Sequence, residues 1–270
     1  MIRCIKFEKL LDNSSTRPFL AYCDRGESWV VKAYAHSHKS TPLLLKPIFN
    51  EFISGALANI IDLPWPKVDI IQLDSQILKQ LKKAKFEILS EWAVGIKYIS
   101  DLQTYKPSKE DLDKTAECIR ELFPQLEMQS SFYGKSVLDN LVKFQDTKFN
   151  TLAIQSDGSP IFIDGSMAFD GHDWNLQKLK WEYIHLEYSP YLKGILTDYR
   201  MFDHWLKKIE EIPELKLHGI FNRIPREWPI PKKYKLELKK LLLSTKVKFI
   251  PLFKEEVEST LHNLSLKLDG

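Results

Sequence analysis

A tight hairpin is the feature that most constrains how this chain can fold. Residues 151–154 and 160–163 are two short runs rich in β-forming side chains, and Asp157-Gly158 lies between them. An Asp-Gly pair favours the tight turns whose twist matches two antiparallel strands. Because the outer ends of such a hairpin lie close together, we expect Asn150 at its start to lie near Asp164 at its end.

The polar side chains around this hairpin have the chemistry that phosphoryl transfer requires. That reaction needs oxygen ligands for Mg²⁺ and a carboxylate beside the attacking hydroxyl. Asn150 and Asp164 can face one metal ion, while Asp146 faces the hydroxyl. Asp164 directly follows Phe162-Ile163, where a carboxylate at the end of a buried strand is costly unless it is paired or metal-bound. Taken alone, Asp146 also fits a helix cap and Asn150 a turn residue.

Composition narrows the class of protein. The chain has 270 residues, of which 44% are apolar and 28% charged, which suits one large domain or two lobes with their own cores. The net charge of +3 gives no electrostatic case for nucleic acid or an anionic membrane as partner. The three cysteines lack disulfide or metal spacing, and no export segment or long apolar run is present, so we expect a cytoplasmic protein without a membrane partner.

The first part of the chain has mainly β-type patterns. The expected strands are residues 2–5, 19–23, 28–34, 68–73 and 86–99. Apolar residues at helical spacing predict one helix over 47–61 and a shorter one over 75–84. Pro64 and Pro66 end the first of these helices, because the residue before a proline is pushed towards extended geometry.

Beyond residue 107 the pattern changes to helices. The expected helices are one that opens at residue 108 and those over 134–144, 174–188, 198–212, 232–244 and 252–266. We therefore expect an α+β fold with a β-rich lobe over residues 1–103, a helical lobe over 104–270 and a cleft between them.

Two further residues fit a nucleotide site. Lys32 ends the apolar run at 29–32, and Glu51 falls early in the helix that follows. A lysine held by a glutamate can reach nucleotide phosphates, although each residue alone also fits a solvated surface. The order of the strand lysine, the helix glutamate and then Asp146, Asn150 and Asp164 is the order in which kinases present these groups.

Several longer stretches carry a family resemblance. They are residues 29–32, 50–58, 63–66, 138–146, 150–154, 162–169 and 224–228. In these stretches the chain resembles the HipA-like kinase family, the bacterial branch of the protein-kinase-like fold. The resemblance extends over about residues 14–228 and implies a two-lobed kinase-like architecture.

The resemblance implies a role for each candidate residue. It makes Asp146 the catalytic aspartate and Asn150 and Asp164 the Mg²⁺ ligands. It makes Lys32 the phosphate-binding lysine and Glu51 its helix partner.

Two nucleotide-binding segments also follow from the resemblance. The extended segment from Glu91 to Ile96 resembles the inter-lobe hinge, whose backbone groups would receive the adenine. Ser14 and Ser15 lie in the loop that would hold the phosphates, and in similar kinases a serine of this loop becomes phosphorylated.

The expected activity is that of an ATP- and Mg²⁺-dependent kinase that phosphorylates Ser or Thr in a protein substrate. Two alternatives stay open: a small-molecule phosphotransferase of the aminoglycoside type, and a pseudokinase that only binds. The resemblance further implies a toxin role and an antitoxin or other regulatory protein as partner. The lysine clusters over 79–85 and 232–240 fit solvated helix faces, so we expect no nucleic-acid partner apart from a tRNA-associated substrate.

Overall fold

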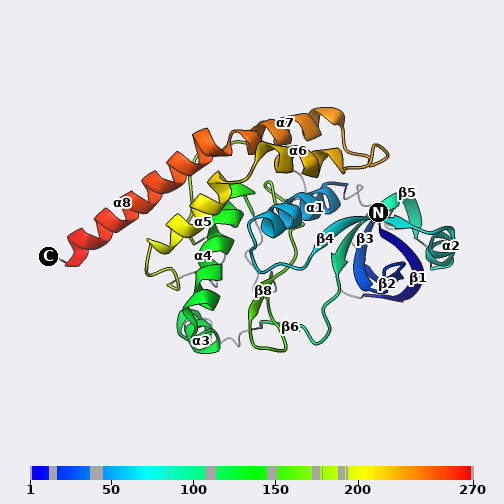
Figure 1. The fold of residues 1–270 in the computed structure, drawn as a ribbon, viewed down its shortest axis with the longest axis horizontal. Helices are drawn as coiled ribbons and strands as arrows, with labels where there is room; N and C mark the ends of the chain where they lie inside the picture. Colours follow the sequence, from blue (N-terminus) through cyan, green and yellow to red (C-terminus); the bar gives the residue numbers. More distant parts are fainter. Residues whose placement is uncertain are drawn as a thin grey trace.

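The computed structural model describes residues 2–11, 17–36, 45–84, 86–106, 114–144, 151–171, 177, 179–187, 192 and 194–268. A small β-barrel lies at one end of the molecule, and most of the helices lie at the other end (Figure 1). The expected mixture of a β-rich first part and a mainly helical second part is confirmed. Among the helices of the described residues, none is both long enough and apolar enough to cross a membrane.

Five strands form the barrel, in the order β1-β2-β3-β5-β4. They are β1 (Ile2–Leu10), β2 (Phe19–Cys23), β3 (Ser28–His36), β4 (Val68–Leu73) and β5 (Glu87–Lys97). Neighbouring strands pair antiparallel except β1 and β4, whose parallel pairing closes the barrel. Trp29, Val31, Ile71 and Ala93 are among the buried residues that fill its interior. Each of the expected strands is present, but closure through β1 and β4 was not predicted.

The segment expected to be the hinge is part of a barrel strand. Residues 91–96 belong to the C-terminal half of β5, and Ile96 pairs with Val30 on one side and Val68 on the other. Its backbone therefore belongs to the barrel and not to an open connection. The chain leaves β5 after Lys97 and next forms β6 (Gln103–Thr104).

The predicted hairpin is confirmed, and it belongs to a second sheet. β7 (Leu152–Ile154) and β8 (Pro160–Phe162) pair antiparallel, and β6 adds to the other side of β7. Asp157 accepts a hydrogen bond from the Ser159 amide at 2.9 Å, and Gly158 takes a φ of 82°. This is a left-handed backbone conformation that glycine adopts without strain.

Two helices accompany the barrel. Helix α1 (Leu45–Ile60) is buried on all sides from residue 48 to residue 58, as expected for a helix covered by neighbours on every face. Helix α2 (Ser75–Lys83) buries only Ile77 and Leu81, and its lysines point largely to solvent, which matches a solvated face.

The helical part is built around α4 (Leu126–Leu141), which is buried over residues 131–141. The other helices are α3 (Thr115–Leu122), α5 (Met201–Glu210), α6 (Glu214–Asn222), α7 (Lys232–Leu243), the π-helix η3 (Thr245–Phe249) and α8 (Ile250–Leu268). Helix α6 was not predicted from the sequence. Figure 1 shows α6 and α7 on the side of α1 that faces away from the hairpin.

The helix expected over 174–188 is wrong for the described residues of that range, which form turns and irregular chain. Side chains of α4 bind this backbone instead: Asn140 donates to the His185 carbonyl at 2.8 Å and accepts from the His185 amide at 2.7 Å. Ser136 donates to the Leu186 carbonyl. Because α4 already satisfies these backbone groups, the apolar spacing of the segment does not produce a helix.

Trp228 joins the helical part to the barrel. It lies between α6 and α7, and its indole Nε1 donates to the Trp92 carbonyl in β5 at 3.0 Å. Its ring packs on Tyr34 of β3 and Phe52 of α1, with centroid separations of 5.1 and 6.0 Å. One buried side chain thus contacts both the barrel and α1.

Candidate active site

Three candidate residues meet between the barrel, α1 and the end of β8. The Nζ atom of Lys32 lies 2.6 Å from Glu51 Oε2 and 3.2 Å from Asp164 Oδ1. Lys32 comes from β3, Glu51 from the second turn of α1, and Asp164 from the segment just after the hairpin. The ammonium group therefore bridges two carboxylates that are far apart in the sequence.

The surroundings of this cluster set its charges. The Lys32 and Glu51 side chains are 8% and 0% exposed, while the Asp164 side chain is 37% exposed. Burial by itself lowers the pKa of Lys32, but the Asp164 and Glu51 carboxylates outweigh it and raise that pKa. Burial raises the pKa of Glu51 to about 7 despite the opposing effect of Lys32. For Asp164 burial is outweighed by Lys32 and by hydrogen bonds, so its pKa falls well below the usual range.

Asp164 is held by its own segment as well. The Ser166 hydroxyl donates to Asp164 Oδ1 at 2.7 Å, and the Ser166 amide donates to the same oxygen at 3.3 Å. The Asp164 backbone has a φ of 64°, in the left-handed region that aspartate visits more readily than bulkier residues. The carboxylate is therefore oriented, ionised and partly open to solvent.

Helix α1 contributes two polar residues whose roles were not predicted from the sequence. Asn50 Nδ2 donates to the carbonyls of Ser166, Ala168 and Gly171 at 3.1, 2.7 and 3.2 Å. Ser54, one turn later, lies with its hydroxyl 3.3 Å from the Gly165 carbonyl. The sequence contains a hint, since these are polar residues four apart in a mainly apolar helical run.

The same segment is tied to the end of α4. The Phe169 amide donates to the Val142 carbonyl at 2.5 Å, and the Asp170 amide donates to the Lys143 carbonyl at 3.0 Å. The Lys143 and Asp170 side chains also form an ion pair at 3.8 Å. These bonds connect the Asp164 segment with the C-terminal end of α4 and the two residues that follow it.

The other predicted site residues fall into two groups. Asp146, Asn150, Ser14 and Ser15 lie outside the described residues. Glu91 and Ile96 lie within β5, as described above.

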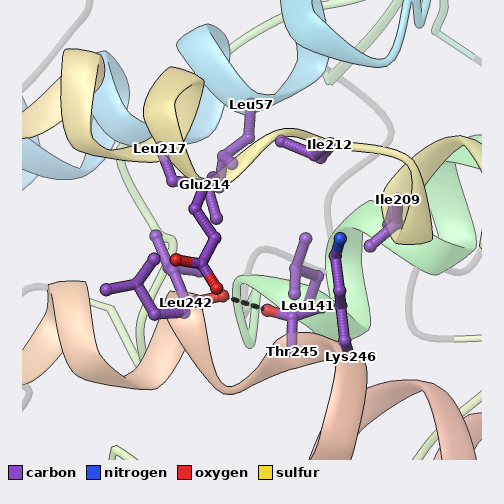
Figure 2. Close-up of a pocket in the computed structure, with 10 residues that line it drawn as sticks. Leu57, Leu141, Ile209, Ile212, Glu214, Leu217, Leu242, Thr245 and Lys246 are labelled. Carbon is purple, nitrogen blue, oxygen red and sulfur yellow. Dashed lines mark hydrogen bonds between the residues drawn. The ribbon is translucent and has the colours of Figure 1, made fainter.

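Two hollows elsewhere are not part of this cluster. Figure 2 shows a pocket between α5, α6, α7 and η3, into which Glu214 points. Its volume of about 20 Å³ suits one water molecule and not a nucleotide. A surface groove of about 410 Å³ includes the Leu63-Pro-Trp-Pro66 stretch. Neither hollow is lined by Lys32, Glu51 or Asp164.

The chemistry of the cluster fits a metal-bound nucleotide. An ionised carboxylate is a suitable ligand for a hard divalent cation, and an ammonium group suits phosphate oxygens. Within the described ranges, no group of three or more His, Cys, Asp or Glu side chains is placed to hold a metal by itself. A cation at Asp164 would thus need phosphate oxygens, water or further residues to complete its coordination.

Comparison with protein families decides the identity of the fold. A model for HipA-like kinases matches residues 5–249. This chain belongs to the HipA-like kinase family. The protein is accordingly an ATP-dependent kinase of the protein-kinase-like type, whose reaction uses ATP and a divalent metal ion. No curated protein matches the chain by sequence.

Several solved structures are similar to this HipA-like kinase at low sequence identity. The proinflammatory kinase CtkA of Helicobacter pylori is 13% identical with a TM-score of 0.58, over 95% of this chain and 96% of CtkA. The Golgi casein kinase with Mn and ADP bound is 11% identical with a TM-score of 0.50, over 94% of this chain and 74% of that one. HipA of Shewanella oneidensis MR-1, in complex with HipB and operator DNA, is 11% identical with a TM-score of 0.49, over 90% and 71% of the two chains.

Proposed function

We propose that this HipA-like kinase transfers the γ-phosphoryl group of ATP to a Ser or Thr hydroxyl of a protein, with Mg²⁺ as the divalent ion. The observation that carries the proposal is the buried Lys32 ammonium held between Glu51 and Asp164. Above the raised pKa of Glu51 both carboxylates are ionised, and the cluster then has a net negative charge that a divalent cation would compensate. In the same proposal residues 1–103 and 104–270 form the two lobes around the nucleotide.

Each residue of the cluster has a role in this reaction. Lys32 donates to phosphate oxygens, and Glu51 keeps the ammonium group at the end of the apolar run in β3. Asp164 binds Mg²⁺ together with Asn150, and Ser14 and Ser15 donate to the phosphates. The bound Mg²⁺ would neutralise charge that develops on the phosphate oxygens.

The transfer step itself is assigned to Asp146. The substrate hydroxyl oxygen forms a bond to the γ-phosphorus, and its proton passes to the Asp146 carboxylate. The bond from the γ-phosphorus to the bridging oxygen breaks, and its electron pair leaves with ADP. An antitoxin-type partner and a toxin role stay predictions of the resemblance, and a tRNA-associated substrate stays a prediction from the lysine clusters.

The test is phosphotransfer with labelled ATP and Mg²⁺ on the full chain. We expect label on protein with the parent chain and its loss in Asp164→Asn and Asp146→Asn. The matched control is Asp203→Asn, an exposed aspartate of α5 that should leave the transfer unchanged. Thermal unfolding of each variant separates loss of chemistry from loss of folding.

The same assay distinguishes the rival functions. Label on aminoglycosides and not on protein would overturn the protein-kinase proposal in favour of a small-molecule phosphotransferase. A thermal shift with ATP and Mg²⁺ but no transfer to either acceptor would identify a binding module. Undiminished transfer by both aspartate variants would remove their assigned roles.

A further inference from the structure

We infer that Asn50 is a positioning residue, which holds the segment after Asp164 in place so that this carboxylate can bind the divalent cation. The inference rests on the proposed function, because it assigns Asn50 a task in that same site. Asn50 Nδ2 bonds to backbone carbonyls of the segment after Asp164. It acts through the backbone that carries Asp164.

The contacts of Asn50 are unusual in number and in burial. The residue is 0% exposed, and one amide nitrogen lies within hydrogen-bond distance of three carbonyls. These carbonyls belong to Ser166, Ala168 and Gly171, which span most of the segment that follows Asp164. Three carbonyl oxygens that converge on one point repel each other unless a donor lies between them.

The backbone of this segment needs such support. Asp164, Phe169 and Asp170 have φ values of 64°, 58° and 70°, in the left-handed region that non-glycine residues seldom adopt. Conformations of this kind persist where surrounding contacts determine them. Asn50 supplies those contacts from α1, and the carbonyls at the end of α4 supply them from the other side.

Asn50 also connects the two charged groups of the site. It precedes Glu51 in α1, so the same helical turn holds Lys32 through Glu51 and the Asp164 segment through Asn50. Because α1 is buried on all sides around these residues, this turn has little freedom to move. The phosphate-binding lysine and the metal-binding carboxylate are therefore positioned by one rigid element.

A purely structural role is the alternative, and the chain offers a matched control for it. Asn59 lies on the same helix, and its Nδ2 lies 3.4 and 3.3 Å from the carbonyls of Trp65 and Pro66. It also accepts from the Val68 amide at 3.0 Å. Asn59 thus organises a different loop with the same chemistry, and the groups that it bonds belong to Trp65, Pro66 and Val68 and not to the segment after Asp164.

The experiment measures how ATP binding depends on Mg²⁺, by calorimetry or metal-dependent thermal shift on the full chain. We expect Asn50→Ala to raise the Mg²⁺ concentration for half-maximal effect by about 10–100-fold, the range typical of residues that orient metal ligands. Asn50→Asp should raise this Mg²⁺ concentration at least as much, because a carboxylate would repel the three carbonyls. Asn59→Ala should reduce thermal stability without changing the Mg²⁺ requirement.

Two results would overturn the inference: an unchanged Mg²⁺ requirement in Asn50→Ala, or an equal change in Asn59→Ala. If Asn50→Ala does not fold, Asn50→Ser retains one donor and should show an intermediate Mg²⁺ requirement.

Should the parent chain bind ATP with Mg²⁺ but phosphorylate no protein, the kinase proposal fails while the inference stands. If protein phosphorylation is normal but the two alanine variants behave equally, the inference fails while the kinase proposal stands. A parent chain that binds no ATP with Mg²⁺ overturns both.

Discussion

Lys32 Nζ lies 2.6 Å from Glu51 Oε2, and both side chains are almost completely withdrawn from water. Such a pair is costly to break on one side only, because the remaining charge stays buried without its partner. It also fixes where the ammonium group can meet a nucleotide. These two properties can be tested separately.

Lys32→Met should lower kcat/KM for phosphotransfer by about 10²–10³-fold, because one preorganised cation is lost from the phosphate site. Glu51→Gln should have a smaller effect, since the ammonium group remains. Steady-state kinetics at saturating Mg²⁺ measure both. Equal activity of Lys32→Met and the parent chain would contradict the assignment of Lys32 to the phosphates.

The raised pKa of Glu51 predicts a pH dependence of stability. Burial raises this pKa from 4.5 to about 7, so in that interval the folded chain binds a proton that the unfolded chain has lost. The free energy of unfolding should therefore decrease as pH rises from 4.5 to about 7. Glu51→Gln removes this titration, and urea unfolding across the interval should show a flatter pH profile. A profile as steep as that of the parent chain would assign the dependence to other groups.

A second buried ion pair, Lys135 with Asp139 in α4, should be important for stability. The two side chains are 0% and 2% exposed, and Lys135 Nζ lies 4.4 Å from the centre of the Phe144 ring. Lys135→Met leaves the carboxylate buried and should cost about 3–5 kcal/mol in the free energy of unfolding. The control is Lys207→Met, which breaks an exposed i,i+4 pair with Glu211 and should cost about 0.5 kcal/mol or less. If chemical denaturation gives a similarly small loss in the free energy of unfolding for Lys135→Met and Lys207→Met, the importance of the Lys135–Asp139 pair for stability is contradicted.

At Gly165 the Asp164 segment lies close against α1. A Cβ at this position would overlap the Ser54 hydroxyl and lie 3.6 Å from the Glu51 Cα. Gly165→Ala should therefore displace the segment and weaken ATP binding in the presence of Mg²⁺. Gly219→Ala in α6 meets open space and should instead stabilise the chain by about 0.5–1 kcal/mol. Isothermal calorimetry and thermal unfolding of both variants check this contrast. A Gly165→Ala variant that binds ATP with Mg²⁺ as tightly as the parent chain would contradict it.

Local sequence patterns were sufficient for the hairpin and for several single elements. Asp157-Gly158 between two β-prone runs predicted the β7–β8 pair, and the strand over 68–73 has the bounds of β4. These features depend on turn chemistry and on alternating side chains within a few residues. They are therefore readable without knowledge of the tertiary structure.

Features that depend on distant contacts were not readable in this way. The range 174–188 has helical apolar spacing, but Ser136 and Asn140 of α4 bind its backbone near residues 185 and 186. The role of Asn50 depends on carbonyls more than 110 residues away in sequence. The strand over residues 91–96 was predicted from the sequence, but its pairing with β3 on one side and β4 on the other depends on distant contacts of this kind.

The packing of Trp228 has a consequence for how this kinase can be switched. In a mechanism that disables a kinase by swinging the glutamate-bearing helix outward, α1 would have to separate from the Trp228 ring behind it. That movement would expose Phe52 and Trp228 to water, at about 1.5–3 kcal/mol for each large apolar side chain. We therefore expect control of activity to act on access to the nucleotide and substrate, while α1 keeps the position in which Glu51 contacts Lys32.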